Sequence, residues 1–185
     1  MPVLSTAAEV DAWLAEAGWH PGRDVGEDAC DAIAAVIERY RSYGVAIEPS
    51  APALAFIREH AFLRAVIDTA PENFAIFTPH LVFKGDAEEI SELAGELGTK
   101  LFPVGYDTYD GSTVLIDETG RFFLSHHTGA YWLGCEKYEA LMSLTAGDMD
   151  DAEDYFVRSD CRHGNPAKRF PGGECAQARL PEPLR

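Results

Sequence analysis

The chain has 185 residues, of which 46% are hydrophobic and 25% are charged, a composition typical of one globular domain and not of a disordered or fibrous protein. Its 31 acidic and 15 basic residues give a formal net charge of −16, which repels phosphate backbones and argues against direct nucleic-acid binding. The same charge favours a basic protein as partner.

The N-terminus lacks a basic stretch followed by an apolar run, and no later segment reaches about eighteen uncharged apolar residues. We therefore expect no signal peptide, no membrane contact and a cytoplasmic location. The chain has four widely spaced cysteines, which we expect to be thiols in that reducing compartment: Cys30, Cys135, Cys161 and Cys175.

Three amphipathic helices are predicted in the first sixty residues. Thr6 and Glu9 have the spacing of a capping box, ahead of an apolar stripe that Gly18 ends. Apolar residues at helical spacing over 33–40 indicate a second helix. Ser50, with a proline two residues later, opens a third helix that runs to about residue 60.

After about residue 60 the spacing of the apolar residues changes from that of helices to that of strands. "FLRAVID" and "NFAIFTP" are short runs rich in aromatic and β-branched residues, followed by a helix over about 86–97. "LFPVG", "STVLID", "RFFLSH" and "AYWLG" are four further extended runs, and Asp117 and Gly120 suit the ends of a type I turn between the middle two. A last helix over about 136–144 ends near Gly147. The pattern predicts an α+β fold with about six strands.

Two groups of residues near the end of this core have side chains that can bind a metal ion or act as a nucleophile, but neither forms a recognisable motif. His126 and His127 lie in an extended run, which should send their side chains to opposite faces of a sheet and prevent them from sharing a metal ion. Cys135 stands at a strand-to-helix junction, where a thiol can be activated, yet no nucleophile motif surrounds it. We interpret all three as parts of a scaffold.

The tail offers the best metal candidate. Cys161, His163 and Cys175 would supply three of the four ligands of a zinc site, but the paired C-x-x-C spacing of such sites is missing. We therefore expect no metal and no cofactor. Residues 158–185 carry six bases and three acids, net +3, whereas the preceding 157 residues carry net −19, so the tail is expected to fold back over part of that body.

Acidic and aromatic residues gather on three predicted turns: "YDTYDG", "DETG" and the run from residue 148 to 154. Loops commonly carry recognition, and tyrosine beside carboxylates suits contact with a basic surface. From their charge and predicted exposure, the candidate partner-binding residues are Asp107, Tyr109, Asp110, Asp117, Glu118, Asp148, Asp150 and Asp151.

Taken together, "AGWHPGR" (17–23), "LGTKLFPVGYDTYDGSTVLIDETGRFFLSHHTGAYWLG" (97–134) and "YEALMSLTAG" (138–147) resemble the SUKH superfamily of bacterial immunity proteins, in particular its third branch. The resemblance spans most of residues 13–147. One departure is that His60 and Ala61 stand where such proteins typically have a glycine pair, so we expect the turn there to form without glycine's freedom to adopt positive φ.

The resemblance implies a non-catalytic protein that binds a cognate polymorphic toxin, in many cases a nuclease, and neutralises it. We expect one SUKH-like domain over residues 3–147, with a mixed or antiparallel sheet and helices mainly on one side. Residues 148–185 would form an acidic and then basic extension. Two alternatives stay open at this point: a SUKH-like adaptor or regulatory module unrelated to toxins, and a small metal-dependent enzyme that uses the tail cysteines and His163. The sequence does not give the oligomeric state.

Overall fold

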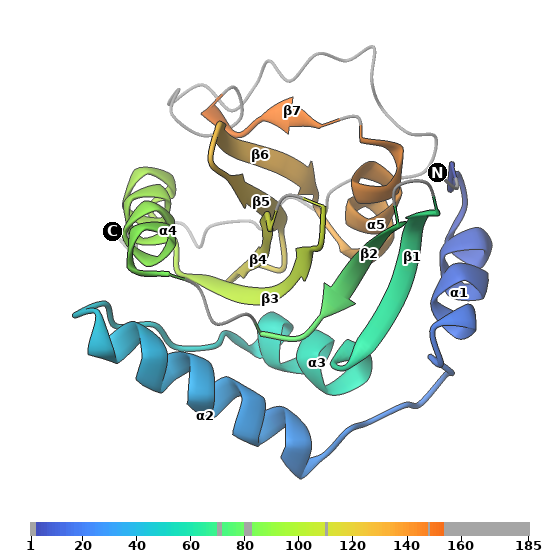
Figure 1. Ribbon diagram of the computed structural model, residues 1–185, viewed down its shortest axis with the longest axis horizontal. Helices are drawn as coiled ribbons and strands as arrows, with labels where there is room; N and C mark the ends of the chain where they lie inside the picture. The colour runs from blue at the N-terminus through green and yellow to red at the C-terminus, as the bar shows by residue number, and fades with distance from the viewer. Residues whose placement is uncertain (1–2, 70–71, 80–82, 110, 148, 154–185) are drawn as a thin grey trace, which may run out of the picture.

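Seven antiparallel strands follow one another in chain order across a single sheet in the computed structural model of the protein (Figure 1). The structure describes residues 3–69, 72–79, 83–109, 111–147 and 149–153. The strands are β1 (Leu63–Thr69), β2 (Glu72–Phe77), β3 (Leu101–Asp107), β4 (Thr113–Asp117), β5 (Phe122–His126), β6 (Gly129–Gly134) and β7 (Asp150–Asp151). The α+β class and all six expected strands are confirmed, and β7 adds a seventh.

The described residues form five helices that pack around the sheet: α1 (Ala7–Glu16), α2 (Glu27–Ser42), α3 (Ala51–His60), α4 (Lys84–Leu97) and α5 (Lys137–Ala146). The predicted start signals act as expected, since the Thr6 side chain accepts a hydrogen bond from the Glu9 amide and Ser50 caps α3. Gly98 and Gly147 end α4 and α5 in the left-handed conformation, with φ of 63° and 66°.

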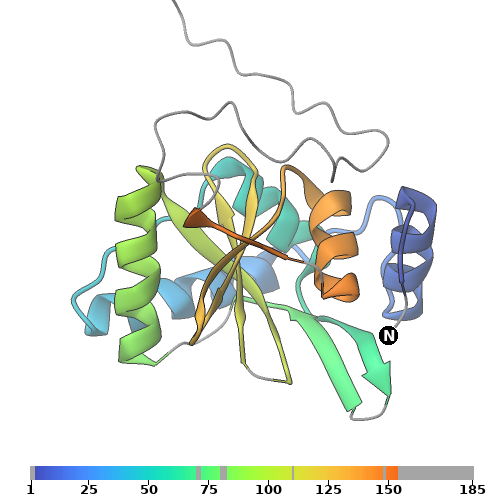
Figure 2. The same ribbon diagram turned by 90° about the horizontal axis from the view of Figure 1, so that it is seen from above.

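The helices divide unequally between the two faces of the sheet. α5 and α1 lie together on one side, while α4 stands on the other side of the strands (Figure 2). The aromatic ring of Phe56 in α3 lies in the core, where it meets Phe77 of β2 at 5.7 Å and Phe122 of β5 at 5.3 Å between ring centroids. Buried residues of all five described helices belong to one core cluster with the sheet.

The junction between α3 and β1 takes an uncommon backbone conformation. Phe62 has a φ of 67°, the only positive value among the described residues other than glycine. Its amide donates to the Phe77 carbonyl at 2.9 Å, which starts the pairing of β1 with β2. The turn after His60 and Ala61 is thus made without glycine, as expected, but it still uses the left-handed region that glycine favours.

The sheet continues beyond residue 147, where the sequence predicts an extension outside the domain. Asp150 and Asp151 pair with Trp132 and Tyr131 of β6, and Ala152 is buried. This short edge strand was missed because two consecutive aspartates have no strand propensity, and only pairing with β6 makes them extended.

Candidate functional site

The residues selected as partner contacts do not form one cluster. Tyr109 lies in the β3–β4 loop, and Glu118 lies in the β4–β5 turn. Consecutive turns of an antiparallel meander fall at opposite ends of its strands, so these two residues are at opposite ends of the sheet. Both are exposed, Tyr109 at 70% of its surface. Asp110 and Asp148 lie outside the described residues.

Asp107 organises the loop that presents Tyr109. Its carboxylate accepts hydrogen bonds from the Tyr109 amide at 2.6 Å and from the Asn73 side chain at 3.3 Å. Thr108 extends the same set of contacts, because its hydroxyl donates to Asn73 Oδ1 at 3.1 Å and accepts from the Phe74 amide at 2.9 Å. The β3–β4 loop is therefore tied to β2, and this restricts the backbone that carries Tyr109.

The prediction that Asp117 is exposed was wrong. Its side chain is fully buried, and one carboxylate oxygen accepts from the backbone amides of Thr119 at 2.8 Å and Arg121 at 2.9 Å. The other oxygen accepts from Arg121 Nε at 2.6 Å. An aspartate at the first position of a turn readily bonds the backbone that follows it, so this residue holds the hairpin together and does not face a partner.

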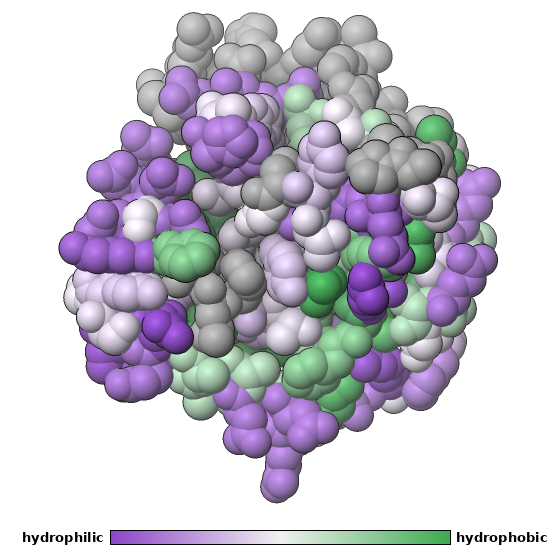
Figure 3. Space-filling view, viewed as in Figure 1, coloured by the Kyte–Doolittle hydropathy of each residue, from purple (hydrophilic) through white to green (hydrophobic). Residues whose placement is uncertain are grey.

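A groove runs between α4 and the β5–β6 turn, with a cavity volume of about 350 Å³. Glu89, Glu92 and Glu96 line one wall, and Glu153 lies at the end of the described chain on the other side. Hydrophilic side chains gather over α4 in the space-filling view (Figure 3). We call this feature the acidic groove. It was not predicted, although the spacing of the three α4 glutamates, at intervals of three and four residues, places them on one helical stripe.

The opposite wall of the acidic groove contains both histidines. Their rings lie 3.8 Å apart between centroids, so the expectation that they point to opposite faces was wrong. The reason is that His127 lies past the end of β5, in the turn, where strand alternation no longer applies. The Thr128 amide donates to His126 Nδ1 at 3.2 Å, and the Thr128 hydroxyl lies 2.6 Å from the same nitrogen and 2.7 Å from the Tyr131 hydroxyl.

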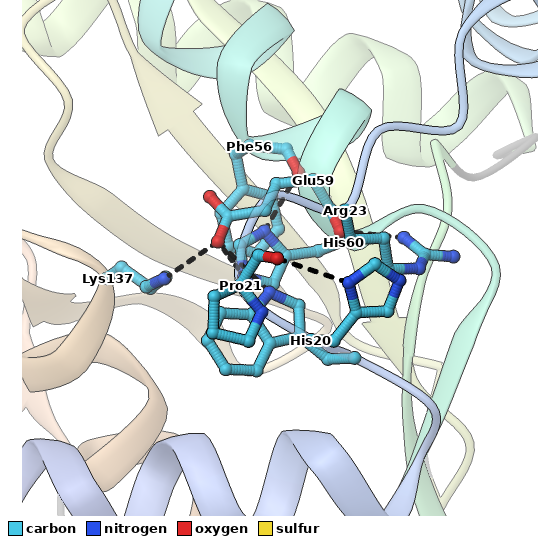
Figure 4. Close-up of polar contacts among 8 residues, drawn as sticks. His20, Pro21, Arg23, Phe56, Glu59, His60 and Lys137 are labelled. Atoms are coloured by element: carbon cyan, nitrogen blue, oxygen red, sulfur yellow. Dashed lines mark hydrogen bonds and ion pairs between the residues drawn. The ribbon is translucent and has the colours of Figure 1, made fainter.

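A second polar group joins the α1–α2 loop, α3 and α5 (Figure 4). Glu59 Oε1 accepts from Trp19 Nε1 at 3.0 Å and from Lys137 Nζ at 3.3 Å. Arg23 donates to the backbone carbonyls of Glu59 at 2.6 Å and Ala61 at 2.7 Å. Partial burial acts to raise the pKa of Glu59, but neighbouring charges and hydrogen bonds outweigh it and hold that pKa below its usual value.

His60 lies at the buried end of this group. Its ring stacks on Phe56 at 4.4 Å, and Nδ1 donates to the Phe56 carbonyl at 3.0 Å. Burial lowers the pKa of His60 to about 4, so the imidazole is neutral at physiological pH. Because the side chain is closed off from solvent, no substrate can reach it, and the arrangement is structural.

Trp19 and Arg23 belong to the segment 17–23 that resembles SUKH proteins, and a comparison with protein families decides what this segment means. The model of the SUKH-3 immunity protein family matches residues 6–147. The chain belongs to the SUKH-3 immunity protein family. Its role is accordingly the general one of that family, neutralising a toxin. No curated protein and no solved structure matches the chain significantly.

Two glycines in the segments that resemble SUKH proteins are required by close approach, and not by backbone conformation. A Cβ on Gly105, in "PVG", would lie 2.7 Å from the Ile76 carbonyl oxygen of β2. A Cβ on Gly134, before α5, would lie 2.8 Å from the Ala140 amide nitrogen and 2.7 Å from Glu139 Cγ. In this SUKH-3 chain such segments thus specify the packing of the fold.

The described part of the chain gives no support for the metal site considered from the sequence. It contains no group of three or more histidine, cysteine or acidic side chains placed to hold a metal ion. Cys161, His163 and Cys175 lie outside it. Cys30 is a free thiol, but Cys135 is disulfide-bonded, so the expectation of four thiols was wrong there. No helix among the described residues is long and apolar enough to cross a bilayer.

Proposed function

We propose that this chain is a stoichiometric inhibitor that binds a basic cognate toxin, in particular a nuclease, and neutralises it by surface complementarity without catalysis of its own. The observation that carries the proposal is the SUKH-3 match over residues 6–147 in a chain whose net charge is −16. A nuclease needs a basic surface to hold its substrate, and an acidic protein of this size can cover such a surface.

The charge also determines how the complex forms. Long-range attraction steers an acidic inhibitor onto a basic toxin, which accelerates association and makes its rate fall as salt rises. Residues with charged or aromatic side chains at the surface are the ones that such steering can bring into contact. Five candidates keep surface available for that role: Asp107, Tyr109, Glu118, Asp150 and Asp151. Asp110 and Asp148 remain candidates from sequence, and Asp117 is withdrawn because it is buried.

The test uses the full-length chain and the toxin encoded beside its gene. Co-expression should restore growth to cells that produce the active toxin, and the two purified proteins should elute together in a one-to-one complex. Association rates should fall steeply between about 0.05 M and about 0.5 M salt, because screening shortens the range of the attraction. An unrelated protein of similar negative charge is the control. The proposal fails if growth is not restored and no complex forms at low salt.

A further inference from the structure

The acidic groove has an apolar floor beneath its charged wall. Leu93 and Leu97 of α4 lie on one side and Ala130 of β6 on the other, and all three are among the residues that line the cavity of about 350 Å³. This volume is at the lower end of the range for sites that take small ligands. The groove therefore offers both contact area for an aliphatic stem and carboxylates for a positive charge.

The charges of the α4 wall are not used within the described part of the molecule. Glu88 pairs with Lys84 at 3.3 Å, but Glu89, Glu92 and Glu96 make no ion pair or hydrogen bond with any described residue. Like charges three or four residues apart on a helix destabilise it. No lysine or arginine is among the residues that line the groove. Three glutamates thus lie together at a cost to the helix, with no basic partner among the described residues to offset it.

The chemistry of the groove selects its occupant. An anion is repelled by the glutamates, and a metal ion finds no set of three ligands in the described chain. A long cationic side chain fits, because its methylenes cover the leucine floor while its charged end reaches the carboxylates. Arginine suits the site best, since its planar guanidinium donates to more than one carboxylate at once.

We infer that the acidic groove between α4 and the β5–β6 turn receives an arginine or lysine side chain of the toxin. The inference rests on the proposed function and adds the place of contact. It makes α4, and not only the acidic loops, part of the inhibitory surface. The described lining then has two roles in the complex: the glutamates attract the cation, and the leucines exclude water from it.

The test compares two full-length triple variants with the wild type. The first is Glu89→Gln, Glu92→Gln and Glu96→Gln, which removes three charges from the groove without changing side-chain size. The control removes three charges from exposed positions on α1 and α2, away from the groove, by Glu16→Gln, Glu27→Gln and Asp31→Asn. Both variants have the same net charge, so a general loss of steering affects them equally.

The probe is the toxin encoded beside the gene, in a catalytically inactive form, with dissociation constants measured at about 0.15 M salt. The groove variant should bind at least tenfold more weakly than the control, roughly the effect of one lost charge-assisted contact. Equal affinities of the two variants would overturn the inference and leave the proposed function intact. Absence of binding by the wild type would reject the proposed function itself. Tighter binding by the groove variant would overturn the inference and indicate that residues of this chain's own basic tail, within 158–185, occupy the groove.

Discussion

Arg23 holds the end of α3 through the carbonyl oxygen of Ala61, to which its guanidinium donates a hydrogen bond of 2.7 Å across 38 residues of sequence. A second bond of 2.6 Å reaches the Glu59 carbonyl. The last carbonyls of a helix have no partner within it, and here one side chain from the α1–α2 loop satisfies two of them. The backbone then turns through Phe62 into β1, so Arg23 fixes the direction in which the sheet begins.

Replacement of Arg23 by lysine should therefore be destabilising even though the charge is retained. A lysine ammonium cannot reproduce the fork that bonds two carbonyls, and the free energy of unfolding should fall by about 2 kcal/mol. Urea denaturation measures this change. Arg39→Lys, at an exposed position in the last turn of α2, is the control and should stay within about 0.5 kcal/mol of wild type. Equal effects of the two replacements would contradict the role assigned to Arg23.

Because Phe62 is in the left-handed conformation, we expect glycine to give a more stable protein than alanine at this position, the reverse of their order inside a helix. Both Phe62→Gly and Phe62→Ala lose the ring, but only glycine adopts a φ of 67° without strain, so the glycine variant should be more stable by about 1 kcal/mol. At exposed Ala35, inside α2, the order should reverse, with Ala35→Gly losing about 1 kcal/mol. Thermal unfolding of the three variants checks both orders of stability. If the alanine variant at position 62 is more stable than the glycine variant, the left-handed conformation is excluded.

Buried His60 should make the fold sensitive to acid. Its pKa is lowered to about 4 by burial, against which the adjacent Glu59 carboxylate works, while Lys137 and Arg23 lower it further. Between the ordinary histidine pKa near 6.5 and pH 4 the unfolded chain binds a proton that the folded chain does not. The stability contributed by the neutral ring is thus complete above about pH 6.5 and is lost as the pH falls through that window.

The size of this effect follows from the same shift. The wild type should lose about 3 kcal/mol more than His60→Phe between about pH 7 and about pH 4, since the phenylalanine keeps the stacked ring but cannot titrate. Urea denaturation of both proteins across this range gives the difference, in which the contributions of carboxyl groups distant from His60 cancel. Parallel pH profiles for the two proteins would show that folding does not lower the pKa of His60.

Gly134 should tolerate no side chain. A methyl group there would lie 2.8 Å from the Ala140 amide nitrogen, which belongs to the α5 backbone and cannot move without shifting the helix. Gly134→Ala should therefore cost about 1 to 3 kcal/mol. Gly95→Ala is the control, because Gly95 is an exposed helical position with open space around it and should gain up to about 1 kcal/mol. A neutral result at Gly134 would mean that β6 and α5 are less closely packed than the structure has them.

Local signals in the sequence were sufficient for the helices and for most strands. The capping box of Thr6 and Glu9, and the terminal glycines Gly98 and Gly147, act within one turn of chain, so they could be recognised from residues that are neighbours in sequence. The alternation and turn residues of the meander are equally local. Family membership followed from the same segments, because the recurring glycines and turns specify one arrangement of strands.

Burial and spatial grouping were decided only by the tertiary structure. Asp117 has the composition of an exposed turn, but its contacts with Arg121 draw it inside, and two aspartates become β7 only because β6 is there to pair with them. The acidic groove arises because α4 crosses the face of the sheet beside a turn more than thirty residues further along the chain. A sequence states which side chains are charged; only the packing of distant segments determines which of them remain without an internal partner and are free for another protein.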